Sequence, residues 1–70
     1  MKIINCGIVI YLITKNHIAR IERTELDGAP AWAIYYDNMQ GEIVQGPTAA
    51  RAAFDLARWE VRWMDWQDKR

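Results

Sequence analysis

Residues 46–67 read GPTAARAAFDLARWEVRWMDWQ, and this segment has the clearest secondary-structure signal in the chain. Gly46 and Pro47 break a preceding strand, and Thr48 is a suitable N-cap because its hydroxyl can accept a hydrogen bond from a first-turn amide. Alanine recurs through the first half of the stretch, and neither glycine nor proline occurs after Pro47. Alanine is the strongest helix former, so we predict one long C-terminal helix over residues 48–67.

This helix carries two apolar stripes, whereas packing on a single sheet requires only one. The first stripe contains the small and medium-sized residues Ala50, Ala53, Phe54, Ala57, Val61 and Met64. The second stripe contains Ala52, Leu56, Trp59, Trp63 and Trp66, on nearly the opposite side of the helix. The pattern alone leaves open which stripe faces the sheet.

A charged ridge separates the two stripes and consists of Arg51, Asp55, Arg58, Arg62 and Asp65. Helical spacing predicts ion pairs between Arg51 and Asp55 and between Arg62 and Asp65. An exposed pair of this kind contributes only about 0.3–0.5 kcal/mol, so the ridge is interpreted as a solvated face.

The stripe left uncovered by the sheet is the candidate interaction surface. If the tryptophan stripe is uncovered, it predicts a partner-binding site made of Trp59, Trp63, Trp66, Arg51, Arg58 and Arg62. Tryptophan and arginine are enriched at protein interfaces. A competing interpretation is that at least two of the three tryptophans are ordinary core residues.

The opposite arrangement predicts self-association. If the tryptophans pack on the sheet, the small residues of the first stripe form a close-approach surface for a second helix. The residues of this homodimer surface would be Ala50, Ala53, Ala57, Val61 and Met64.

Residues 3–13 are mostly β-branched or aromatic, which predicts a long strand that is at least half buried on both faces. The even-numbered positions are uniformly apolar and are expected to face the core. They are Ile4, Cys6, Ile8, Ile10 and Leu12. Gly7 is expected to mark a bulge or bend in this strand.

A hairpin follows in the next part of the chain. Residues 17–26 fit a strand or a helix, but Asp27-Gly28 is a strong hairpin signal and residues 31–36 alternate as a returning strand. The strand interpretation places Ala19 and Ile21 inward. A second turn over residues 37–41 and a short strand over residues 42–45 complete a meander spanning residues 1–45. The predicted fold is α+β, with a three- or four-stranded antiparallel sheet followed by one long C-terminal helix, in a single domain over residues 1–70.

The composition excludes several classes of function. Nine Lys plus Arg balance nine Asp plus Glu, which argues against a strongly basic nucleic-acid binder and against an acidic mimic of DNA. Cys6 and His17 are the only residues of their types, so neither an intramolecular disulfide nor a zinc site is expected, and no cofactor is predicted. The apolar segment 3–13 is shorter than the ~20 residues of a membrane helix. A cytoplasmic location is expected.

No usual catalytic arrangement is recognised, and a non-enzymatic protein is expected. Cys6 is expected to be a buried, inert thiol because it lies within an apolar strand. His17 is expected at an exposed turn edge with no carboxylate beside it in the local sequence. The chain contains no serine.

Nucleic-acid binding is the main alternative function. The arginines of the ridge share a helix face that Lys69-Arg70 extends, and the three tryptophans could stack on unpaired bases. The two aspartates on the same ridge weaken this face. Single-strand binders more often place aromatic residues on a sheet, where Tyr11, Trp32 and Tyr35 offer only a partial platform.

The order of elements resembles that of small accessory proteins of phages and mobile elements. The similarity rests on the hairpin strands, the Asp27-Gly28 turn, the short strand, and Gly46-Pro47-Thr48 opening an alanine- and tryptophan-rich helix. Anti-CRISPR inhibitors are found among these proteins. The resemblance implies a non-catalytic inhibitor that binds a host defence complex in the host cytoplasm through the uncovered helix face and its arginines. The zero net charge differs from the acidic DNA mimics of this group, which implies steric or allosteric blocking.

Overall fold

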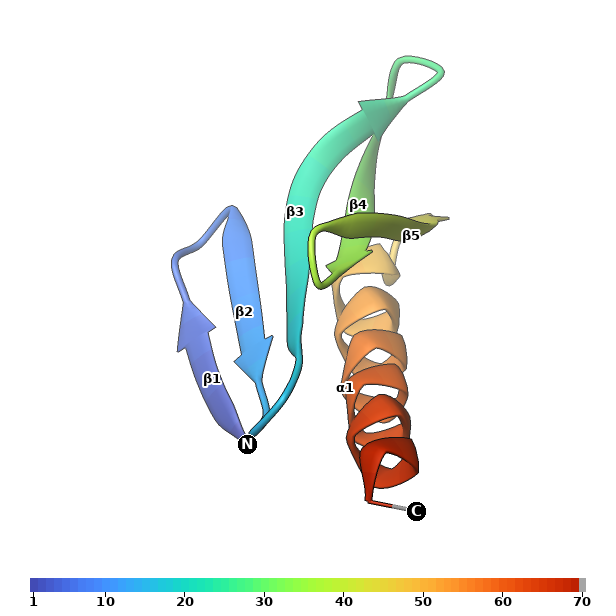
Figure 1. Cartoon of the computed structure of the whole chain (residues 1–70). Coiled ribbons are helices and arrows are strands. Elements are labelled where there is room, and N and C mark those ends of the chain that lie inside the picture. The colour runs from blue at the N-terminus through green and yellow to red at the C-terminus, as the bar shows by residue number, and fades with distance from the viewer. Residues whose placement is uncertain (70) are drawn as a thin grey trace.

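The computed structural model describes residues 1–69, which form one antiparallel sheet with a single helix against one of its faces (Figure 1). The strands are β1 (Lys2–Asn5), β2 (Val9–Ile13), β3 (Ile18–Leu26), β4 (Ala29–Tyr36) and β5 (Met39–Gln45), and the helix is α1 (Ala49–Asp68). The strands lie in chain order, β1-β2-β3-β4-β5. The α+β class and the antiparallel meander before a long helix are confirmed, but the described sheet has five strands where three or four were predicted.

The additional strand arises because residues 3–13 form a hairpin and not one long strand. The chain reverses at Gly7, whose φ of 82° lies in the region that favours glycine. The side-chain oxygen of Asn5 accepts a hydrogen bond from the backbone N–H of Gly7 at 2.9 Å, and the N–H of Cys6 donates to the carbonyl of Val9 at 2.8 Å. These local hydrogen bonds stabilise the reversal.

The hairpin changes the environment of the even-numbered residues. Leu12 is fully buried and Ile10 packs against the core, as expected. Cys6 and Ile8 instead lie exposed at the hairpin tip. Ile4 pairs with Tyr11, and side chains alternate across a strand, so Ile4 lies on the face opposite Leu12.

The β3–β4 hairpin agrees with the prediction. Asp27 and Gly28 both have positive φ, at 53° and 78°, as a tight two-residue hairpin turn requires. Residues 18–26 are a strand, and Ala19 and Ile21 are fully buried. The turn therefore sets the register that places Ile21 opposite Ile34 in the core.

The next turn is shorter than predicted. Asp37 and Asn38 adopt left-handed φ values of 51° and 70°, so two residues reverse the chain and β5 begins at Met39 instead of residue 42. Gly41 lies within β5, where an added Cβ would approach the ring of Tyr36 to 2.8 Å. This close approach explains a glycine in the interior of a strand.

The helix begins and ends within one residue of the predicted bounds, but Thr48 makes no side-chain capping hydrogen bond. Its backbone carbonyl instead accepts from the N–H of Ala52 at 2.9 Å. Thr48 is therefore the N-cap residue, as predicted, but its hydroxyl does not make the expected capping hydrogen bond.

The alanine-bearing stripe of α1 faces the sheet. The fully buried core combines residues of β2, β3, β4 and α1: Leu12, Ala19, Ile21, Ile34, Ala53, Ala57 and Val61. Small side chains let the helix axis approach the sheet closely, which a row of indoles would prevent. Three of the five residues expected to mediate self-association, Ala53, Ala57 and Val61, are thus covered by the sheet and unavailable to a second helix; of the other two, Ala50 is exposed and Met64 is half-buried.

No helix within residues 1–69 has both the length and the apolar character required to span a bilayer.

Candidate functional site

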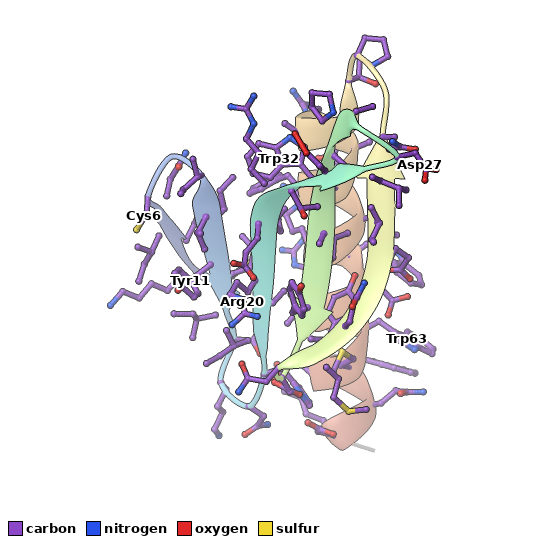
Figure 2. All side chains as sticks on the ribbon, turned by 90° about the horizontal axis from the view of Figure 1, so that it is seen from above. Cys6, Tyr11, Arg20, Asp27, Trp32 and Trp63 are labelled. Carbon is purple, nitrogen blue, oxygen red and sulfur yellow. The ribbon has the colours of Figure 1, made fainter. Side chains whose placement is uncertain are left out.

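Trp59, Trp63 and Trp66 form a stacked row on the outer side of α1, here called the tryptophan ladder. Because the alanine face is turned to the sheet, the i, i+4, i+7 spacing of the indoles places them on the opposite side of the helix. Their exposed fractions are 60%, 41% and 50%. Figure 2 shows Trp63 beside the helix and beyond the β5 side of the sheet.

The indoles of the ladder stack on one another. The ring centroids of Trp59 and Trp63 are 6.0 Å apart with an interplanar angle of 8°, and those of Trp63 and Trp66 are 5.1 Å apart at 23°. Trp63 therefore has an aromatic neighbour on each side. Stacking restricts the rotamers of all three residues, so the ladder is a pre-ordered apolar strip in which the central Trp63 is stacked on both sides and each outer indole is stacked against Trp63.

The arginines beside the ladder differ in their pairing. Nε of Arg51 lies 3.3 Å from Oδ2 of Asp55, as predicted. The guanidinium carbon of Arg58 lies 5.9 Å from the centroid of the Phe54 ring, a cation–π contact. Neither Arg58 nor Arg62 has a carboxylate partner among residues 1–69.

The predicted ion pair between Arg62 and Asp65 is absent from the described part of the chain. Oδ1 of Asp65 instead lies 3.3 Å from the hydroxyl oxygen of Thr14, in the turn between β2 and β3. Asp65 thereby connects the helix to the β2–β3 turn and does not form an ion pair with Arg62.

Two hollows follow the ladder on its arginine side. One, of about 340 Å³, is lined by Asp55, Arg58, Trp59, Arg62 and Trp63. The other, of about 350 Å³, is lined by Met1, Thr14, Lys15, Arg62, Asp65, Trp66 and Lys69. Arg62 lines both hollows, so they adjoin along the helix. The structure thus brings Trp59, Trp63, Trp66, Arg58 and Arg62 together on one surface, with Arg51 ion-paired at its edge.

His17 makes contacts that the sequence did not reveal. Its Nδ1 lies 2.6 Å from Oδ2 of Asp37, its Nε2 contacts Oδ2 of Asp68, and its side chain is only 16% exposed. The hydrogen bond with Asp37 is the main cause that raises the pKa of His17, and the same bond lowers the pKa of Asp37. The partners are 20 and 51 residues away in sequence, so no local pattern could have indicated them. This cluster ties two turns of the sheet to the end of α1.

The face of the sheet opposite α1 carries a second aromatic surface. Tyr11, Arg20 and Tyr35 are adjacent in register, and the guanidinium carbon of Arg20 lies 4.3 Å from the centroid of the Tyr35 ring. Trp32 does not extend this platform, because it packs against the core on the helix side. One face of Tyr35 is covered by Arg20, so that face cannot stack on a base.

Cys6 is exposed at the tip of the β1–β2 hairpin, so the expectation of a buried thiol is wrong. Residues 1–69 contain no cluster of three or more His, Cys, Asp or Glu side chains able to hold a metal ion.

Comparison with known proteins found no matching family, no similar curated protein and no similar solved structure.

Proposed function

We propose that this protein is a non-catalytic protein-binding module that docks on its partner through the tryptophan ladder. The observation that supports the proposal is the exposure of three mutually stacked indoles on the outer side of α1. With about half of each indole exposed, the ladder offers roughly 300 Å² of contiguous apolar surface. Patches of this size on a small domain are commonly interaction sites.

The order of the ladder favours binding. Association costs free energy when flexible side chains must be immobilised, roughly 0.5–1.5 kcal/mol for each. Stacking already restricts Trp59, Trp63 and Trp66, so less of this cost remains to be met on docking. Buried tryptophan is also the residue that most often dominates the binding energy of a protein interface.

The geometry favours a protein over a nucleic acid. Base stacking requires open aromatic faces, but Trp63 has an indole on each side. The net charge of zero gives the chain as a whole no long-range attraction to a polyanion, so any such attraction is limited to the few cations beside the ladder. A partner's apolar side chains can instead pack against the exposed ring edges.

The mechanism we propose is steric: α1 covers part of the partner's surface and blocks what normally binds there. This matches the inhibitory role that the resemblance to phage accessory proteins implies, with a host macromolecular complex as the target. The chain would contribute a rigid helix face and no chemistry of its own.

The test compares two variants that each remove an exposed apolar side chain. The wild-type protein is used to capture its partner from the host cell, the partner is identified by mass spectrometry, and the affinity is then measured with both purified proteins. Trp63→Ala is expected to weaken binding by at least about tenfold, because it removes the central indole. Ile8→Ala, at the exposed hairpin tip, is expected to leave the affinity unchanged. Unchanged affinity in folded Trp63→Ala would refute the ladder as the docking surface.

A further inference from the structure

Four cations gather along one side of the tryptophan ladder, here called the cationic flank. They are Lys15, Arg58, Arg62 and Lys69. Lys15 comes from the turn between β2 and β3, whereas the other three come from the last three turns of α1 and the residue after it. Because all four line the two hollows beside the ladder, the flank and the indoles form one continuous surface.

The carboxylates near the flank contact groups outside it, although Asp65, whose partner is a neutral hydroxyl, keeps its negative charge. Asp55 pairs with Arg51, Asp65 lies against the hydroxyl of Thr14, and Asp68 contacts His17. None of the four flank cations has a carboxylate partner among residues 1–69. The chain as a whole is neutral, but the two hollows are lined by these four cations and by only two carboxylates, Asp55 and Asp65, so this surface carries an excess of positive charge.

We propose that the ladder and the cationic flank bind an acidic amphipathic helix of the partner protein. This rests on the function proposed above and specifies the chemistry of the partner. Apolar side chains of that helix cover the indole edges, and its carboxylates enter the two hollows to pair with the flank cations. Arginine suits this role because its planar guanidinium binds a carboxylate through two hydrogen bonds.

The length of the surface matches two turns of helix. Trp59 and Trp66 are seven positions apart on α1, which corresponds to about 10 Å along the axis. A partner helix presents apolar residues at i, i+3 or i+4, and i+7 over the same distance. The rigid row of indoles thus matches one apolar stripe, and the flank matches the acidic residues beside that stripe.

A second copy of the chain fits this surface poorly when the two helices pair antiparallel. In an antiparallel helix pair related by a two-fold axis, each flank meets the same flank of the other copy. Arg58 and Arg62 would then face their own counterparts, which is unfavourable for like charges close together. An acidic partner has no such repulsion.

The experiment uses three defined probes against the purified full-length chain. The acidic probe is a synthetic amphipathic helical peptide with a leucine stripe and glutamates beside it, the basic probe has lysine in place of every glutamate, and the third probe is oligothymidine. Binding is followed by tryptophan fluorescence and confirmed by calorimetry. The acidic peptide is expected to bind at least about tenfold more tightly than the basic one, with an affinity that falls as salt is added.

One double and one single charge reversal distinguish the flank from the rest of the surface. Arg58→Glu combined with Arg62→Glu is expected to abolish or invert the preference for the acidic peptide. Arg23→Glu changes an exposed cation on β3, away from the ladder, and is expected to preserve it.

Other results would contradict the inference, and they distinguish its failure from failure of the proposed function. Equal affinity for both peptides, or none for either, refutes an acidic partner, while the Trp63→Ala comparison still decides the proposed function. Tight, salt-dependent binding of oligothymidine that is lost in the Arg58→Glu/Arg62→Glu variant would assign the surface to a nucleic acid and refute both proposals.

Discussion

His17 connects three separate segments through one side chain. Because the hydrogen bond with Asp37 raises the pKa of His17 above its ordinary value of 6.5, the folded state binds the imidazole proton more tightly than the unfolded state does. The stabilisation is therefore fully present below pH 6.5 and is lost as the pH rises through the raised pKa. The lowered pKa of Asp37 acts at acidic pH. The stability that the Asp37 carboxylate contributes is lost as the pH falls through this lowered pKa. We expect the melting temperature to fall as the pH rises above about 6.5.

His17→Gln tests this dependence, since the amide cannot carry the charge. The variant should be less stable than the wild type by about 1 kcal/mol at acidic pH. Most of the decline in melting temperature above pH 6.5 should be absent from the variant. Asp27→Asn removes a charge at the distant β3–β4 turn and should retain the wild-type profile. A decline of unchanged slope in His17→Gln would show that other groups control the pH dependence.

The two sides of α1 should respond differently to the same added volume. Ala57 is fully buried against the sheet, so Ala57→Leu forces a larger side chain into a close-packed layer and should cost about 1–3 kcal/mol. Ala52 is exposed on the ladder side, and Ala52→Leu should change the stability by no more than about 0.5 kcal/mol. Urea unfolding followed by circular dichroism measures both. Equal losses would mean that the ladder side is also packed against protein.

Element boundaries could be predicted where a single local cause determines them. The helix follows from its alanines and from the break at residues 46–48, and the β3–β4 hairpin follows from Asp27-Gly28. The β1–β2 reversal was missed because residues 3–13 are strand formers almost throughout, while the turn depends on one side-chain acceptor, Asn5, and one residue with positive φ, Gly7. The start of β5 was missed because two non-glycine residues adopt left-handed conformations there.

The candidate site was predictable as a set of residues but not as a surface. Helical periodicity alone grouped the three tryptophans and the nearby arginines. It could not decide which stripe faces the sheet, because both are apolar; close helix-to-sheet packing selects the smaller side chains. The hollows depend on Lys15 and Thr14, which only the tertiary fold brings beside Arg62 and Asp65.

The hydrophobic core of the molecule does not extend to β1, the first strand of the sheet. The described chain is elongated, with principal extents of 41 × 20 × 19 Å. The buried cluster joins β2, β3 and β4 to α1, whereas every residue of β1 is exposed. In Figure 1 the β1–β2 hairpin stands apart from the helix. The first strand is held mainly by its hydrogen bonds to β2 and not by the core.

This unequal distribution predicts a hierarchy of local opening. An edge strand with no buried side chain can separate without disrupting the core, so β1 should open at a lower free energy than β3 and β4. Amide hydrogen exchange measured residue by residue should be at least about tenfold faster for hydrogen-bonded amides of β1 than for those of β3 and β4. The amide of Ile21 in the core provides the internal reference, since it should exchange only on global unfolding. If β1 exchanged as slowly as Ile21, the whole sheet would open as one cooperative unit, and the exposed hairpin would be held by contacts other than those to β2.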